Sequence, residues 1–114
     1  MVTGNRLVHP TSNTFTRGYS YGYREEMVER DRALTDSVHH YGAKIIAQLN
    51  HFGVIGESHA MDDCRVLWSA SSIKSPVFGE MSKAMERSDM LAVIEGWAIS
   101  AEYSQRGGFV NRTH

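Results

Sequence analysis

The chain has 114 residues, which is enough for one small domain with a modest core. Its 12 Lys and Arg residues against 13 Asp and Glu residues exclude the basic excess that nucleic-acid and membrane-surface proteins need. A single cysteine, Cys64, excludes an internal disulfide and fits a reducing compartment. Because no apolar run reaches about 18 residues and no signal-peptide pattern opens the chain, we expect a cytoplasmic protein without a membrane span.

The first third of the chain predicts a strand, a loop and a helix. Residues 2–8 contain β-branched side chains and stop at a His-Pro pair, so they predict a strand. Residues 11–22 are polar and rich in turn formers, which predicts a loop. Residues 23–41 carry apolar side chains at helical spacing and end before Gly42, a typical helix stop. The apolar face of this helix is expected to comprise Met27, Leu34, Val38 and Tyr41.

A second strand is predicted at residues 43–49, because this run is apolar on both of its faces. Gln48 stands at its carboxyl end, and His51 and Gly53 follow closely. Parallel α/β proteins place their ligands at the carboxyl ends of strands. These three residues are therefore the candidates for chemistry.

Residues 50–84 predict a long loop, and loops of this length are usually functional. A second helix is predicted to begin at a Ser88-Asp89 cap and to end at Gly107-Gly108, and Phe109-Val110 would open another strand. The apolar face of the second helix is expected to comprise Leu91, Ile94, Trp97, Ala98 and Ala101. The order β-loop-α-β-loop-α-(β) predicts parallel strands with helical crossovers, too few to close an eight-stranded barrel.

Gln48 carries an amide that donates and accepts at once, so it can pair with the alternating N–H and C=O groups of a pyrimidine-like edge, such as that of a flavin. The alternative is a strand-end amide that only bonds loop backbone. His51 is open to two interpretations as well: an acid or ligand-orienting group, or a loop histidine bonded to backbone.

A metal site is not expected. The candidate ligands would be His39, His40, His51, His59 and Cys64. His39 and His40 point in different directions on a helix, and no HExxH or CxxC pattern surrounds His51 or His59.

Five stretches, in order, resemble the old yellow enzyme or NADH:flavin oxidoreductase family of FMN-containing TIM barrels. The QLNHFG stretch that begins at Gln48 resembles the family motif QLxHxG. The other four stretches are VTGNRLVHP from Val2, WSAS with Ser75-Pro76 from Trp68, AME with Asp89 from Ala84, and the AEYSQRGGF end from Ala101. The sequence of these stretches most resembles that of the 2,4-dienoyl-CoA reductase-like, mycofactocin-associated branch of the family. The resemblance implies a partial (β/α)8 barrel, about strands 2 to 3 with their helices, within a single FMN-binding domain spanning residues 1–114.

The resemblance also implies an oxidoreductase that passes hydride from NADH or NADPH through FMN to an activated alkene, an enone or enoyl thioester. Gln48 would bind the flavin pyrimidine ring, Gly4 and Asn5 would line the flavin, and His51 and Gly53 would line the active site. No residue is assigned a catalytic role. An iron–sulfur cluster would belong only to a longer parent chain, and an oligomer is compatible with the family.

The chain departs from the family at both ends. The first barrel strand, the substrate-binding strand after the second helix and the phosphate site lack counterparts, and residues 110–114 form a divergent tail. His114 does not match the family's substrate-binding histidine. The rival hypothesis is therefore a truncated, non-catalytic piece that neither holds FMN tightly nor turns over. A further rival is a metal-dependent hydrolase with the same barrel.

Overall fold

The computed structural model describes residues 1–12, 20–58, 65–77 and 79–110. Its elements are β1 (Val2–Leu7), β2 (Ser20–Tyr21), α1 (Met27–His40), β3 (Ile46–Asn50), the 3-10 turn η1 (Gly53–Ile55), β4 (Trp68–Ser69), β5 (Lys83–Ala84) and α2 (Arg87–Arg106). The predicted succession of strand, helix, strand and helix is confirmed by β1, α1, β3 and α2, whereas the short strands β2, β4 and β5 lie in segments predicted as loops. No helix in these four ranges is long and apolar enough to cross a membrane.

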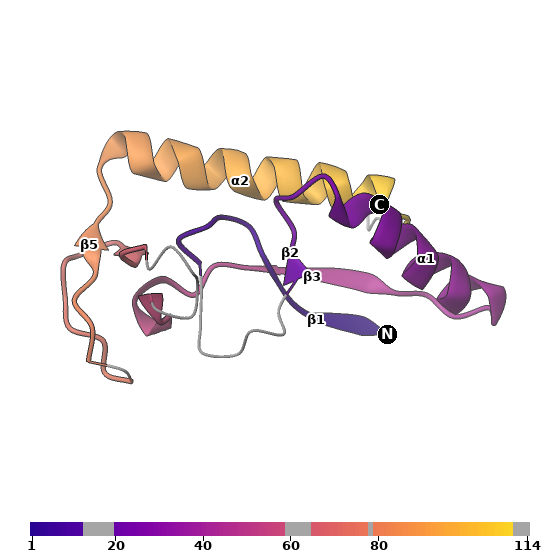
Figure 1. Cartoon of the computed structure of the whole chain (residues 1–114), viewed down its shortest axis with the longest axis horizontal. Helices are drawn as coiled ribbons and strands as arrows, with labels where there is room; N and C mark the ends of the chain where they lie inside the picture. The colour runs from indigo at the N-terminus through magenta and orange to yellow at the C-terminus, as the bar shows by residue number, and fades with distance from the viewer. Residues whose placement is uncertain (13–19, 59–64, 78, 111–114) are drawn as a thin grey trace.

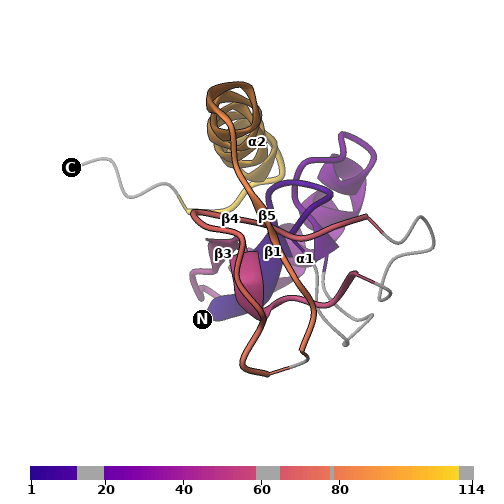
Figure 2. The same ribbon diagram turned by 90° about the vertical axis from the view of Figure 1, so that its left-hand side faces the viewer.

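β1 lies between β2 and β3, and both pairings are parallel. α1 follows β2 and leads into β3, and α2 runs along the strands in the opposite direction (Figure 1). In the view of Figure 2 both helices lie on the same side of the strands. The small parallel pair β4–β5 lies beyond the carboxyl ends of β1 and β3 (Figure 1). The three strands and the two helices therefore form two layers, with both helices on one face of the parallel sheet. This arrangement is typical of parallel strands joined by helical crossovers.

The prediction for residues 11–22 is wrong at its end. Ser20 and Tyr21 pair with Arg6 and Leu7 as a short parallel strand, whereas 13–19 lie outside the described residues. The strand predicted at 43–49 begins later, at Ile46, and runs to Asn50, so Gln48 is its middle residue rather than its end. Val110 N donates to Ile45 O at 3.0 Å, which places Val110 alongside the start of β3, although Phe109 and Val110 are not in a strand.

The apolar face predicted for α1 is not the buried one. The helix begins at Met27 rather than at residue 23, and Leu34 and Tyr41 are exposed. Its buried residues are Asp31 and Thr35, one helical turn apart. Asp31 forms a bidentate ion pair with Arg6 of β1, so a polar contact, not an apolar stripe, fastens α1 to the sheet.

The contact face of α2 also differs from the prediction. Leu91, Ile94 and Trp97 are exposed, while the buried residues are small: Gly96, Ser100 and Ser104. Their spacing of four forms one ridge along the helix. A Cβ built on Gly96 would stand 2.3 Å from Val8 O, so only glycine permits this approach of helix to strand.

The N-terminus of α2 is capped differently from the prediction. Glu86, not Ser88, is the N-cap, and its N–H donates to Asp89 Oδ2 at 3.1 Å in a capping box. The predicted stop is confirmed, because α2 ends at Arg106 and Gly108 adopts a φ of 91°. Gly42 lies two residues after the end of α1 and likewise adopts a positive φ, of 77°.

Candidate functional site

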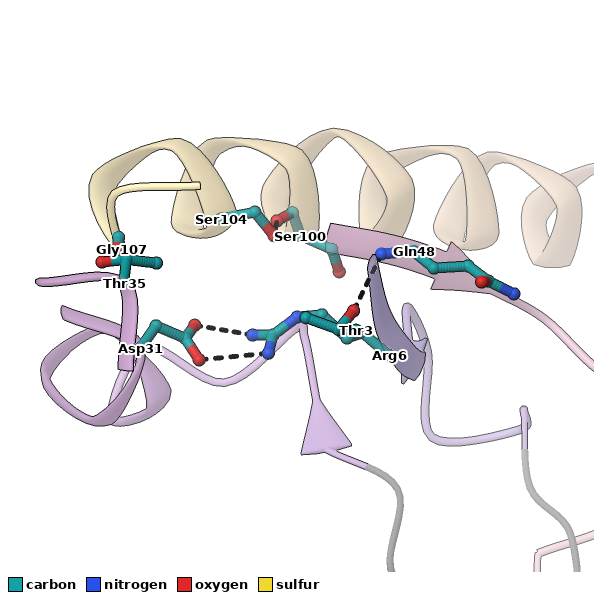
Figure 3. A network of polar contacts seen from close by, with 8 residues as sticks. All are labelled: Thr3, Arg6, Asp31, Thr35, Gln48, Ser100, Ser104 and Gly107. Atoms are coloured by element: carbon teal, nitrogen blue, oxygen red, sulfur yellow. Dashed lines mark hydrogen bonds and ion pairs between the residues drawn. The ribbon is translucent and has the colours of Figure 1, made fainter. Parts of the chain in front are cut away.

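Two of the predicted flavin-contacting residues lie side by side. Asn5 of β1 is the register partner of Gln48 of β3. Gln48 Nε2 donates to Asn5 Oδ1 at 2.7 Å, and the backbone N–H of Gln48 donates to Thr3 Oγ1 at 3.0 Å. The second of these bonds is drawn in Figure 3. Gln48 is therefore held by β1 through both its backbone and its side chain.

The face on which this amide pair lies follows from its neighbours. Arg6, the next residue of β1, pairs with Leu49 and reaches Asp31 on α1 (Figure 3). Successive side chains of a strand point to opposite faces. Asn5 and Gln48 consequently face away from α1, toward the side that the interior of a closed barrel would occupy. Gln48 is exposed there.

Among the residues that the structure describes, the bond between Gln48 and Asn5 leaves several polar groups of the pair without a partner. Oε1 of Gln48 remains an acceptor, and the second N–H of Nε2 remains a donor. Asn5 retains its own N–H2 donors. Gly4, the third predicted residue, precedes Asn5 in β1, and apart from its chain neighbours no described residue has an atom within 4 Å of where its Cβ would stand.

His51 lies just past β3 and is mostly buried. Its Nδ1 accepts from Gly53 N at 3.1 Å, and its Nε2 lies 3.1 Å from Thr11 Oγ1. Burial, with a smaller contribution from His9, lowers the pKa of His51 from 6.5 to about 4. His51 is therefore neutral at pH 7, and it is bonded to a side chain as well as to backbone.

Gly53 supports His51. Its φ of 58° lies in the left-handed region, where a side chain would be strained, and its N–H fixes one ring nitrogen of His51. The structure thus places Gly53 next to the imidazole as a backbone donor.

The residues that sequence reasoning missed are His9 and Thr11, which follow β1. His9 Nδ1 lies 2.8 Å from Thr11 Oγ1, and the His9 ring stacks on Trp68 with centroids 4.9 Å apart. Trp68 belongs to β4, so the middle of the long loop packs against His9. Only the parallel register of β1 and β3 could have indicated that residues 9–11 and 51 meet, since 40 positions separate Thr11 from His51.

A groove of about 460 Å³ lies between β3 and the C-terminal half of α2, on the helix side of the sheet. Its walls are largely apolar and include Leu49, Ala98, Ala101 and Phe109. None of the predicted site residues lines it, so it is separate from the amide pair.

Within the described ranges, no three His, Cys, Asp or Glu side chains gather as metal ligands would. His59 and Cys64, which the sequence analysis weighed, lie outside those ranges, as does His114.

The fold and the amide pair at a parallel-strand face define a piece of an α/β barrel, and solved structures agree. Morphinone reductase superposes with a TM-score of 0.84 at 16% identity, over 95% of this chain and 33% of that one. The old yellow enzyme homologue from Zymomonas mobilis gives a TM-score of 0.83 at 16% identity, over 95% of this chain and 32% of that one. The 6-hydroxypseudooxynicotine amine oxidase from Pseudomonas geniculata N1 gives 0.86 at 18% identity, over 96% and 16%.

These structures confirm the expected fold class: parallel strands and helices that match part of the barrel of an old yellow enzyme homologue. Among curated proteins, the N,N-dimethylglycine/sarcosine dehydrogenase of Chromohalobacter salexigens is 30% identical over 84 residues, which are 74% of this chain and 12% of that protein. No protein-family model matches the chain. The chain spans about a third of the length of the reductase structures and much less of the curated relative.

Proposed function

We propose that this chain is the flavin-pyrimidine-binding segment of an FMN-dependent oxidoreductase of the old yellow enzyme family. The observation that carries the proposal is the bond between Gln48 and Asn5 on the open face of a sheet whose fold matches that family's barrel. The 2,4-dienoyl-CoA reductase-like, mycofactocin-associated branch remains part of the proposal. Residues 1–114 would belong to one barrel domain, with 110–114 as a divergent tail.

The donor set of the site fits a flavin. A flavin pyrimidine edge alternates C=O acceptors with one N–H donor, and Gln48 offers Oε1 as acceptor beside the remaining Nε2 proton as donor. Asn5 adds a further donor, and Gly4 leaves space beside the backbone. FMN would supply the hydride chemistry between NADH or NADPH and an activated alkene, while the residues of this chain bind and orient its ring.

A second candidate reaction is the oxidation of an amine. Two of the similar proteins are named for such chemistry, the dimethylglycine/sarcosine dehydrogenase and the amine oxidase. In this reaction the amine would deliver its α-hydride to the flavin, and no nicotinamide reductant would be needed. The same Gln48–Asn5 pair would serve, because it contacts the flavin and not the substrate.

The non-catalytic alternative concerns the chain on its own. In such barrels the FMN phosphate is held by loops after strands 7 and 8, for which this chain has no counterpart. We therefore propose that the 114 residues alone are inactive, that the substrate is a small molecule in a cytoplasmic setting, and that the chain associates with other barrel segments or with itself.

The test uses a protein that contains this segment within a complete barrel. Purified protein should carry about one FMN per chain by absorbance, and anaerobic mixing should show whether NADH, NADPH or an amine such as sarcosine bleaches it. Reoxidation by an enone identifies the alkene reaction, and bleaching by the amine identifies the second candidate. A colourless protein that does not bind added FMN would contradict both.

A further inference from the structure

A buried threonine lies between two histidines at the carboxyl ends of β1 and β3. Thr11 Oγ1 is 2.8 Å from His9 Nδ1 and 3.1 Å from His51 Nε2. Thr11 is only 4% exposed. The three side chains form a continuous hydrogen-bonded chain across the exits of two neighbouring strands.

Two backbone amides set the direction of this chain. Thr11 N donates to His9 Nδ1 at 3.2 Å, and Gly53 N donates to His51 Nδ1 at 3.1 Å. A ring nitrogen that accepts an N–H carries no proton of its own, so both neutral rings hold their proton on Nε2. His51 Nε2–H must then donate to Thr11 Oγ1, and the Thr11 hydroxyl must donate to His9 Nδ1.

The surroundings keep this geometry fixed. Ser12, fully buried beside Thr11, donates from Oγ to Asn50 O at 3.3 Å and accepts from Phe52 N at 2.9 Å. Val8 N also donates to Asn50 O at 3.2 Å. The two strand exits are thus joined by several bonds, which hold Thr11 between the rings.

The His9 end of this hydrogen-bond network is available to a ligand. Three of the four ring nitrogens have a partner within the network: Nδ1 of both rings and Nε2 of His51. Within the described residues, no hydrogen bond engages His9 Nε2. Burial and the positive charge of Arg65 lower the pKa of His9, against a smaller opposing effect of Asp89. Asp89 is itself paired with Lys83 at 2.6 Å. His9 is consequently a neutral N–H donor, which suits an oxyanion as acceptor.

We infer that Thr11 is a positioning residue, which holds His9 so that its Nε2–H is offered to an oxyanion of the substrate, a carboxylate. This inference deepens the proposed function and rests on it, because the ligand would be the substrate of the flavin reaction. His51 anchors the far end of the chain and does not contact the ligand.

Nitrogen-15 NMR of the histidine rings tests the hydrogen-bond network of His9, Thr11 and His51 directly in the 114-residue protein. Both rings should show the Nε2–H tautomer. Thr11→Val keeps the shape but removes the hydroxyl that donates to His9 Nδ1, so part of the His9 population should carry its proton on Nδ1, and Thr11→Ser should restore the Nε2–H tautomer. A His9 proton on Nδ1 in the unaltered protein would overturn the inference even if Thr11→Val fails to fold, and so would equal tautomer populations in the three proteins.

Sodium acetate, with sodium chloride at equal ionic strength as the control, tests the ligand class. The His9 Nε2 resonance should shift saturably with acetate in the unaltered protein and in Thr11→Ser, and should shift much less in Thr11→Val. No saturable shift in the unaltered protein, or an equal shift in Thr11→Val, would overturn the inference. FMN binding in the barrel-length protein is measured separately, so a failure of the proposed function can be told from a failure of Thr11.

Discussion

Arg6 and Asp31 form a bidentate ion pair, with bonds of 3.0 and 2.6 Å, and both side chains are only 3% exposed. Arg6 also lies over the ring of Phe109, 4.9 Å from its centroid. The pair thus joins β1, α1 and the segment after α2. The other buried residue of α1 is also polar. Thr35 is fully buried, and its hydroxyl donates to Gly107 O at 2.7 Å; both residues are labelled in Figure 3.

Removing one partner of this pair should destabilise the protein strongly. Asp31→Asn leaves Arg6 buried without its counter-charge, which typically costs about 3–5 kcal/mol. Urea denaturation measures the free energy of unfolding. Asp36→Asn, at an exposed position of the same helix, is the matched control and should change stability by less than about 0.5 kcal/mol. Equal midpoints for the two variants would show that the ion pair does not hold α1 in place.

Gly96→Ala should also destabilise, although alanine is the better helix former by about 1 kcal/mol. The added Cβ would meet Val8 O at 2.3 Å, so α2 must move away from β1. Overpacking of this kind typically costs about 1–3 kcal/mol. Urea denaturation again provides the measurement, with Glu95→Ala on the exposed side of α2 as control. A stabilised Gly96→Ala protein would mean that α2 does not lie this close to β1.

Stability should fall as the pH is lowered from about 6.5 to 4. The pKa of His51 is lowered to about 4 in the folded protein, so below pH 6.5 the unfolded chain takes up a proton that the folded one refuses. The loss is about 1–3 kcal/mol, reduced because His51 is partly exposed, and this residue adds nothing further below pH 4.

The control for this pH dependence is substitution of His51. In His51→Gln the loss between pH 6.5 and 4 should be clearly smaller, with the lowered pKa of His9 accounting for part of the remainder. His40→Gln, at an exposed end of α1, should behave like the unaltered protein. Identical pH profiles for all three would exclude His51 as the source.

The 114-residue chain should associate in solution. Leu91, Ile94 and Trp97 of α2 are 55%, 62% and 40% exposed, and the largely apolar groove between α2 and β3 is open. Contiguous exposed apolar surface favours association. Light scattering should give a mass above that of a monomer, and replacing Leu91 and Ile94 with Gln should lower it. A monomer at high concentration would contradict this expectation.

The sequence predicted the alternation of strands and helices because its signals are local. Gly42 and Gly108 end their helices with positive φ, as expected, and residues 2–8 contain the strand Val2–Leu7. Helical periodicity identified α1 and α2 but not their buried faces. Those faces carry polar or small side chains, and hydrophobic patterns do not detect such contacts.

The candidate site was only partly accessible from the sequence. Gln48 and Asn5 were predicted as flavin-binding residues from the family resemblance. Their mutual hydrogen bond depends on the parallel register of β1 and β3. That register contains an irregularity between Val2 and Asn5, which no residue pattern signals. His9 and Thr11 were read only as the end of a strand and the start of a loop, since their partner His51 lies far away in the chain.

The most direct test of the account is the FMN affinity of Gln48→Ala in a protein that contains this segment within a complete barrel. Loss of the amide should leave flavin groups unpaired and weaken binding by about 1–3 kcal/mol, which corresponds to roughly 5- to 150-fold. Gln105→Ala, at an exposed position of α2, is the control and should bind FMN as the unaltered protein does. Fluorescence titration that finds the same FMN affinity for Gln48→Ala and Gln105→Ala would contradict the assignment of Gln48 and Asn5 to the flavin site.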